Sequence, residues 1–222
     1  MMMDQDRWME LKTWASDPLL EPVADGVLAR LYDGSSVLLR PVHPGDKIRI
    51  EEGLSSLSPQ SIYYRFGRQL RRLTDRDLTY FTEVDQEQHI AWGAVDPDDP
   101  AEAGLGIARM IRESRDSQRA EIALTVIDSY HGLGLGTMLL ATLHALAKKS
   151  NIEILRACVM RENHAVVAWF QRLGARPVEI DCQVILDWDL ADSACRTDSA
   201  QRLMELSRQI QRFPSVHAYW QR

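Results

Sequence analysis

Three glycines in alternation, Gly132, Gly134 and Gly136, stand between a strand-like stretch and the clearest helical stretch of the chain. The strand-like stretch, AEIALTVI, ends near Ile127, and a short loop leads from it to the glycines. The helical stretch, GLGTMLLATLHALAKK, has one apolar face, because leucines recur at spacings of four and three: Leu139, Leu143 and Leu146. Glycine lets backbone N–H groups approach a ligand closely, and the start of a helix adds a partial positive charge. The pattern therefore predicts a site for phosphate or pyrophosphate; the alternative is a helix that merely follows a flexible loop.

The two best-known phosphate motifs do not fit this turn. A Walker A loop needs Lys followed by Ser or Thr after its last glycine, but Thr137 and Met138 stand there. The dinucleotide fingerprint needs a third Gly or Ala, and that position falls on Thr137 or Leu139, depending on which two glycines come first. The ligand is therefore expected to carry phosphate groups but to be recognised by a different motif.

The rest of the chain alternates between strand-like and helical stretches, without an internal repeat. We predict strands at 36–42, 89–95, 104–112, 120–127, 152–160 and 183–190, and helices at 46–57, 58–66, 74–84, 134–149, 163–174 and 197–213. This order indicates a single mixed α/β domain at 36–190, preceded by an N-terminal arm at 1–35 and followed by a C-terminal amphipathic helix at 191–222. We expect residues 1–30 to be irregular, with a short amphipathic helix marked by Trp8, Leu11 and Trp14. The C-terminal helix could cover the core or pair with a second copy in a homodimer.

Charge and hydropathy exclude several classes of protein. The formal charge is 26 − 32 = −6 over 222 residues, which argues against a nucleic-acid binder. No apolar run approaches the roughly 18 residues of a membrane span, and the first residues lack the features of a signal peptide, so we expect a cytoplasmic protein. The three cysteines show no metal-binding spacing, and Cys158, inside the apolar run ILRACVM, is expected in the core.

Several segments together resemble one enzyme family. The run HGLGLGTMLL is similar to the coenzyme A-binding motif Q/R-x-x-G-x-G/A of the GCN5-related N-acetyltransferases, and Asn163 to Gly174 is similar to the second cofactor segment of that family. LSPQSIYYRF, RRLTDRDLTYF and AEIALTV resemble the catalytic domain of bacterial protein lysine acetyltransferases. The resemblance covers roughly 37–190. It implies a mostly antiparallel mixed sheet flanked by helices, with 36–190 as the N-acetyltransferase domain.

The same resemblance implies an activity and a cofactor. We expect acetyl transfer from acetyl-CoA to a primary amine, with a protein lysine as the favoured acceptor and no nucleic-acid or membrane partner. Alternatives are a small-amine acetyltransferase, acting on a polyamine, amino acid or aminoglycoside, and a non-catalytic acyl-CoA-sensing module.

The resemblance also implies which residues bind acetyl-CoA. They are Leu124, Thr125, Val126, His131, Gly132, Leu133, Gly134, Leu135, Gly136, Thr137, Asn163 and Phe170. In this set the backbone N–H of Val126 would polarise the thioester carbonyl, and Asn163 would hydrogen-bond the pantetheine amide or cap its own helix. Two positions depart from the family pattern. His131 replaces the usual Gln or Arg, and Phe170 replaces the tyrosine that many members use as general acid, so that role is unassigned.

Glu121 is the candidate general base. A lysine-type amine has a pKa of about 10.4, so it must lose a proton before it can attack a thioester, and a carboxylate can accept that proton. Strand alternation places Glu121 on the same face as Ala123 and Thr125, and Glu121 matches the glutamate that the resemblance marks as the base. The alternative is an ion pair across the sheet with Arg109 or Arg112.

Three further groups of residues have mainly structural interpretations. The arginines Arg65, Arg68, Arg71, Arg72 and Arg76 are typical of a solvated helix face, although they could contact a cofactor phosphate or an acidic partner. Tyr63 and Tyr64 are expected to pack as aromatic residues, with an acceptor pocket as the alternative. His144 is expected to be an ordinary residue of its helix, and no metal site is expected.

Overall fold

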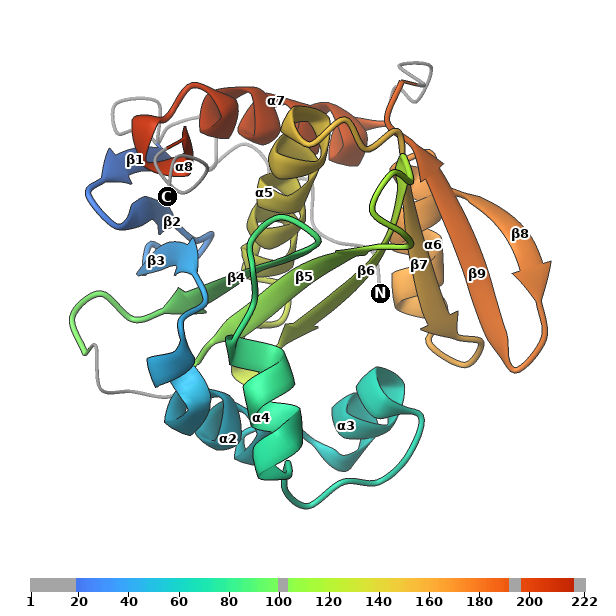
Figure 1. Cartoon of the computed structure of the whole chain (residues 1–222), viewed down its shortest axis with the longest axis horizontal. Coiled ribbons are helices and arrows are strands. Elements are labelled where there is room, and N and C mark those ends of the chain that lie inside the picture. Colours follow the sequence, from blue (N-terminus) through green and yellow to red (C-terminus); the bar gives the residue numbers. More distant parts are fainter. Residues whose placement is uncertain (1–18, 100–103, 192–196, 218–222) are drawn as a thin grey trace.

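The structure is a computed structural model that describes residues 19–99, 104–191 and 197–217 (Figure 1). The predicted helix around Trp8, Leu11 and Trp14 lies outside the described residues, and so does Cys195.

The described residues form a nine-stranded sheet in the order β1-β2-β3-β4-β5-β6-β7-β9-β8. The strands are β1 (Leu20–Val23), β2 (Gly26–Arg30), β3 (Ser36–Pro41), β4 (His89–Val95), β5 (Gly106–Arg112), β6 (Arg119–Val126), β7 (Ile154–Met160), β8 (Arg176–Ile180) and β9 (Gln183–Asp189). Every neighbouring pair is antiparallel except β6 and β7, which are parallel. The mixed, mostly antiparallel sheet is thereby confirmed, as are the strands predicted between 36 and 190.

The six predicted helices also lie where the sequence places them. They are α2 (Lys47–Ser55), α3 (Pro59–Phe66), α4 (Asp75–Thr82), α5 (Leu135–Lys149), α6 (His164–Arg172) and α7 (Asp198–Gln211). The structure adds the short α8 (Pro214–His217) and the 3-10 turns η1 (Pro44–Asp46) and η2 (Asp128–Tyr130), which the sequence did not predict. Ser58 caps α3, and Thr74 forms a capping box with Asp77 at the start of α4. Figure 1 shows α2, α3 and α4 grouped together at the lower side of the view, away from α5 and α7.

The core lies between the sheet and α5. Leu139 and Leu143 of α5 are fully buried, as the leucine spacing predicts, and the inward residues of β4 to β6 pack with them in one cluster. The amphipathic helix α7 then covers α5, with Leu203 and Ile210 buried at the contact. His144 of α5 faces Ser207 of α7 at 2.8 Å. The predicted C-terminal helix thus covers the core of its own chain.

Three expectations are wrong. Residues 20–30 are not irregular but form the hairpin of β1 and β2, which extends the sheet. Sequence patterning also misses β8, because this edge strand contains Pro177 and is exposed at every residue, so it shows no alternation. Cys158 is exposed rather than in the core. Its neighbours Ala157 and Val159 take the inward positions of β7, so alternation turns Cys158 to the opposite face.

Candidate active site

The parallel strands β6 and β7 separate along their length. Their register ends at the pair Ile122 and Ala157, although β6 continues to Val126 and β7 to Met160. Figure 1 shows the two strands diverging toward the side of the molecule where α3 lies. The first half of β6 is therefore held on both sides, whereas its last residues have β5 alone as a neighbouring strand.

The backbone of β6 presents N–H groups to this gap. Ile127 N–H donates to Leu105 O on the β5 side at 3.0 Å, and backbone direction alternates along a strand. The N–H groups of Leu124 and Val126 consequently point away from β5 and into the gap. An oxygen-bearing ligand in the gap could accept hydrogen bonds from them.

The glycine turn follows the end of β6 at the wide side of the gap. Gly132 and Gly134 have φ angles of +78° and +93°, a region that favours glycine. Gly134 is the N-cap of α5, and no side chain caps the helix. Within the described residues, the N–H groups from Gly132 to Thr137 have no hydrogen-bond acceptor, so they form an open array at the positive end of the helix dipole. The residues present therefore fit the phosphate groups of a coenzyme A.

His131 supports the end of β6. Its Nε2 lies 2.9 Å from Val126 O, and because a carbonyl only accepts hydrogen bonds, Nε2 carries the proton. The side chain thus fixes the peptide next to the gap, and in this structure it has a positioning role.

The remaining residues of the predicted cofactor set contribute in different ways. Thr125 faces α2 to α4, whereas Leu124 packs on the core side near Gly136. Leu135 is fully buried, so only its backbone can reach a ligand, and Leu133 is partly buried against the core. Asn163 caps α6, where its side chain accepts a 3.4 Å hydrogen bond from Val166 N–H.

Phe170 is a core residue. It is only 4% exposed and packs beside Trp169, with the two ring centroids 5.2 Å apart. Phenylalanine has no proton to donate, so Phe170 packs within the core and cannot act as a general acid.

Glu121 lies on the exposed face of β6, on the same side as Ala123 and Thr125. Across the sheet its neighbours are Ile111 of β5 and Arg156 of β7, and Arg156 is engaged by Asp187 at 2.7 Å. Among the described residues Glu121 makes no ion pair. The alternative of a pair with Arg109 or Arg112 is therefore wrong. The carboxylate is left accessible.

Helix α3 spans the open side of the gap, and Asp128 anchors its first turn. The Asp128 carboxylate accepts hydrogen bonds from Ser58 N–H, Ser58 Oγ and Ser61 Oγ, at 2.8 to 2.9 Å. Burial raises the pKa of Asp128, but these hydrogen bonds outweigh it, and the pKa is lowered overall. Farther along the helix, Tyr64 OH donates to Glu162 O at 3.3 Å, beyond the end of β7. The helix is thus tied to the loops that follow both diverging strands.

Sequence reasoning missed Asp128. Its partners are 67 and 70 residues away in the chain, and the only local signal is the Ser-Pro-Gln-Ser start of α3, which predicts a cap but not its acceptor.

A pocket opens between α2 to α4 and the sheet. Ile107, Arg109 and Thr125 belong to its sheet wall, and Leu54 and Arg65 belong to its helix wall. Among the arginines of 65–76, Arg65 is half-buried and lines this pocket, whereas the other four are exposed as predicted: Arg68, Arg71, Arg72 and Arg76. The rings of Tyr63 and Tyr64 lie in a tilted contact, with centroids 6.2 Å apart and planes at 45°.

The described part of the chain contains no group of three or more potential metal ligands, and none of its helices has the length and apolarity needed to cross a bilayer.

Two curated acetyltransferases are similar to this chain in sequence. A curated acetyltransferase, Pat of Mycolicibacterium smegmatis, is 34% identical over 157 residues, which are 69% of this chain and 45% of the relative. The chain thus matches less than half the length of that protein. Acetyltransferase PA5475 of Pseudomonas aeruginosa is 28% identical over 61% of this chain and 73% of its own length.

Solved structures agree with these sequence matches. The GNAT domain of S. lividans PAT superposes with a TM-score of 0.67 over 78% of this chain and 99% of that domain, at 24% identity, which shows a common fold. The cAMP-binding acyltransferase from Mycobacterium smegmatis gives a TM-score of 0.54 at 26% identity, over 96% of this chain and 61% of that one.

The model of the Acetyltransferase (GNAT) family matches residues 49–175, more than half of the 222 residues. The matched segment runs from α2 to the end of α6 and includes Glu121, the gap and the glycine turn. The chain therefore belongs to the GNAT family of acetyltransferases.

Proposed function

We propose that this protein transfers an acetyl group from acetyl-CoA to a primary amine, with a protein lysine as the favoured acceptor. The observation that carries the proposal is the gap between β6 and β7, with inward N–H groups on one edge and an open N–H array at its wide side. An extended ligand with an anionic end fits this arrangement, because one strand edge can bind its polar chain while the helix start binds its phosphates.

Acetyl-CoA, when bound, supplies a thioester carbonyl as the electrophile. The N–H groups from Gly132 to Thr137 would hold the pyrophosphate, and the backbone of Leu124 and Thr125 would line the pantetheine arm. The Val126 N–H would donate a hydrogen bond to the carbonyl oxygen, and His131 helps to hold the backbone of Val126 in place through its hydrogen bond with Val126 O. Asn163 and Phe170, on α6, would lie along the opposite wall.

Glu121 is the proposed general base. Its carboxylate shares a strand face with Thr125 and is accessible to an incoming ammonium group. Proton transfer from the amine nitrogen to a Glu121 carboxylate oxygen, directly or through water, leaves a neutral nucleophile. The amine nitrogen then attacks the carbonyl carbon directly, without an acyl-enzyme intermediate. A C–N bond forms and the C–S bond breaks, so coenzyme A leaves as a thiolate and takes up the second proton that the nitrogen loses.

The acceptor is inferred from sequence similarity. The segments around α3, α4 and β6 resemble bacterial protein lysine acetyltransferases, and their counterparts here surround the open face that contains Glu121. The net charge of −6 is compatible with attraction of a cationic acceptor.

The test is acetyl-CoA turnover on a lysine-containing peptide beside a polyamine, a free amino acid and an aminoglycoside. Near pH 7, Glu121→Gln is expected to lower kcat by about 10²- to 10⁴-fold, while the KM for acetyl-CoA stays the same. The deficit should shrink as the pH approaches the amine pKa of about 10.4, because the amine is then neutral in solution.

Glu179→Gln is the matched control, since Glu179 is an exposed strand glutamate on β8, away from the gap. Equal turnover of Glu121→Gln and Glu179→Gln at neutral pH contradicts the base assignment. Tight acetyl-CoA binding with no acceptor acetylated contradicts the enzymatic function and favours a sensing module.

A further inference from the structure

The pocket beneath α2 to α4 has an excess of positive charge that the proposed chemistry does not use. Its described lining contains four arginines and one carboxylate, which gives 4 − 1 = +3. A cationic amine is repelled by such a wall, so the pocket itself is not suited to the reacting ammonium group. Its charge indicates that it accommodates an anion.

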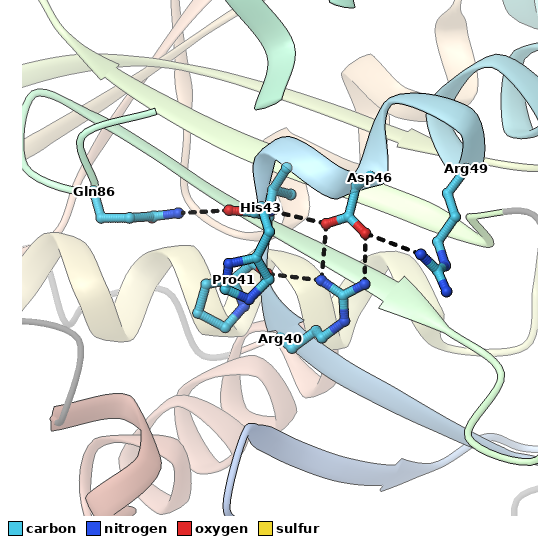
Figure 2. Close-up of polar contacts among 7 residues, drawn as sticks. Arg40, Pro41, His43, Asp46, Arg49 and Gln86 are labelled. Carbon is cyan, nitrogen blue, oxygen red and sulfur yellow. Dashed lines mark hydrogen bonds and ion pairs between the residues drawn. The ribbon is translucent and has the colours of Figure 1, made fainter. Parts of the chain in front are cut away.

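The single lining carboxylate, Asp46, is already engaged. Arg40 donates two hydrogen bonds to the carboxylate oxygens of Asp46, at 2.6 and 2.8 Å, and Arg49 donates a third at 3.4 Å (Figure 2). The backbone N–H of His43 adds a further hydrogen bond at 2.8 Å. Asp46 thus forms a closed cluster with two of the arginines and cannot neutralise the other two.

Those other two are Arg109 and Arg65. Arg109 is 4% exposed, and its guanidinium contacts only uncharged groups among the described residues: His89 Nε2 at 3.1 Å, Phe81 O at 3.5 Å and the Phe81 ring, whose centroid is 4.4 Å away. Burial, with repulsion from Arg65, lowers the pKa of Arg109 to about 9, so the group is still charged at neutral pH. Burial also lowers the pKa of Arg65, although the negative charge of Glu121 opposes this effect. Arg109 is therefore the arginine that lacks a carboxylate most completely.

A buried guanidinium without a carboxylate is costly to stability, because its charge is desolvated and not compensated. Proteins keep such groups where a ligand supplies the missing anion, and two guanidiniums can bind one carboxylate through forked hydrogen bonds. The rest of the lining is largely apolar and includes Leu54, Leu57, Phe66, Leu73 and Phe81. A carboxylate on a short apolar chain therefore fits the pocket better than a strongly hydrated ion such as phosphate.

The pocket also lies beside the reacting centre. Thr125 is part of its wall, and the next residue along β6 is Val126, whose N–H faces the gap. We propose that this pocket binds a carboxylate group of one of the two substrates, with Arg109 and Arg65 as its partners. This inference rests on the proposed transfer of an acyl group from an acyl-CoA to an amine, and it replaces either the acetyl donor or the favoured protein-lysine acceptor of that proposal with a substrate that carries a carboxylate. The carboxylate belongs either to the acyl group of the donor, as in succinyl-CoA, or to an amino-acid acceptor.

Binding is tested first without any turnover. Butyrate, a carboxylate on a short apolar chain, is titrated in parallel with its neutral analogue butyramide, and the dissociation constants are measured by two-dimensional NMR. We expect butyrate to bind at least tenfold more tightly than butyramide. Arg109→Met and Arg65→Met should each weaken butyrate binding at least tenfold, whereas Arg68→Met, an exposed arginine just after α3, should leave it unchanged.

The thermal midpoint of Arg109→Met checks folding, and Arg65→Met serves as a second variant because Arg65 is only half-buried. Equal affinity for butyrate and butyramide overturns the proposal, and so does unchanged butyrate binding in both folded variants. Because this titration needs no acetyl transfer, its result is independent of whether the proposed function holds.

Turnover then identifies which substrate carries the carboxylate. In the donor arm, succinyl-CoA is compared with propionyl-CoA on one amine; in the acceptor arm, lysine is compared with cadaverine, the amine left when its carboxylate is removed. If the enzyme prefers succinyl-CoA or lysine over its partner without the carboxylate, and Arg109→Met loses this preference, that arm identifies the substrate that carries the carboxylate. If butyrate binds but neither arm depends on Arg109, the pocket does not serve a substrate and the proposal is wrong.

Discussion

The three glycines of the turn look equivalent in sequence, but the structure predicts three different responses to alanine. Gly134 is the most constrained, with a φ of +93° and the ring of Tyr32 directly above it. A Cβ at this position would lie 3.0 Å from Tyr32 Cζ and 3.2 Å from two further ring carbons. Arg202 of α7 lies over the same ring, with its guanidinium carbon 4.8 Å from the ring centroid, so a shift of the ring would also disturb this contact.

The loss of stability that we expect for Gly134→Ala has two parts. An L-residue in the left-handed region costs about 1–2 kcal/mol, and overpacking against a fixed ring adds about 1–3 kcal/mol. Gly134→Ala should therefore lower the free energy of unfolding by about 2–4 kcal/mol, allowing for some gain from the less flexible unfolded chain. Coenzyme A should also bind more weakly, since the N–H array shifts when the turn relaxes.

The neighbouring glycines are the matched controls. Gly132 has a φ of +78° but nothing within 4 Å of an added Cβ, so Gly132→Ala should cost only the backbone part, about 1 kcal/mol. Gly136 lies within α5, and its Cβ would be in ordinary contact with Leu124 at 3.7 Å. Gly136→Ala should leave stability unchanged or raise it by up to about 1 kcal/mol.

Urea unfolding of the three variants measures these differences, and calorimetry with coenzyme A measures the affinities. A double-mutant cycle with Tyr32→Ala isolates the steric part, because in that background Gly134→Ala should cost no more than Gly132→Ala. The reasoning is refuted if the three alanine variants lose equal stability, or if Tyr32→Ala leaves the cost of Gly134→Ala unchanged.

Two further predictions concern α3 and the contact between α5 and α7. Asp128→Ala removes the acceptor of three hydrogen bonds, so urea unfolding should show that the free energy of unfolding falls by about 1–3 kcal/mol. The KM for the amine should also rise more than the KM for acetyl-CoA. Equal changes in both KM values contradict a specific role of Asp128 in holding α3. Burial lowers the pKa of His144 to about 4, below the roughly 6.5 of an unfolded histidine, so the unfolded state binds the proton first as the pH falls. Stability from this residue should be complete above about pH 6.5 and decline toward pH 4, by roughly 3 kcal/mol in all. In urea unfolding, His144→Leu should reduce the decline of stability with falling pH, whereas Ser207→Ala, which keeps the imidazole buried, should retain it. If the free energy of unfolding of His144→Leu and of the wild type falls equally with pH, another group causes the decline.

Local sequence was sufficient for most elements of the fold. The leucine spacing of α5, the caps Ser58 and Thr74, and the alternation in β6 each depend on interactions within a few residues, so the sequence shows them directly. The strands at the edges of the sheet were harder to predict. β8 is exposed at every position, so it lacks the hydrophobic periodicity by which a strand is recognised.

The glycine turn and Glu121 could be proposed as a site from sequence, because steric freedom at glycine and the cost of a mid-strand carboxylate are local properties. The sequence could not show that β6 and β7 diverge after Ile122, since strand separation depends on what both strands pack against. Nor could it show that Asp128 holds α3, or that Arg109 is buried without a carboxylate while Arg40 and Arg49 share Asp46.

The sequence by itself thus predicted an anion-binding turn and a candidate base, and it determined the order of most elements. The tertiary structure alone decided which charges are compensated and which face a pocket. The physical reason is that hydrogen bonding and sterics in a turn act between near neighbours in the chain, whereas desolvation and charge pairing depend on every group nearby in space. Arg65 and Arg109, 44 positions apart, line one cationic pocket only because the helices α2 to α4 fold over the sheet.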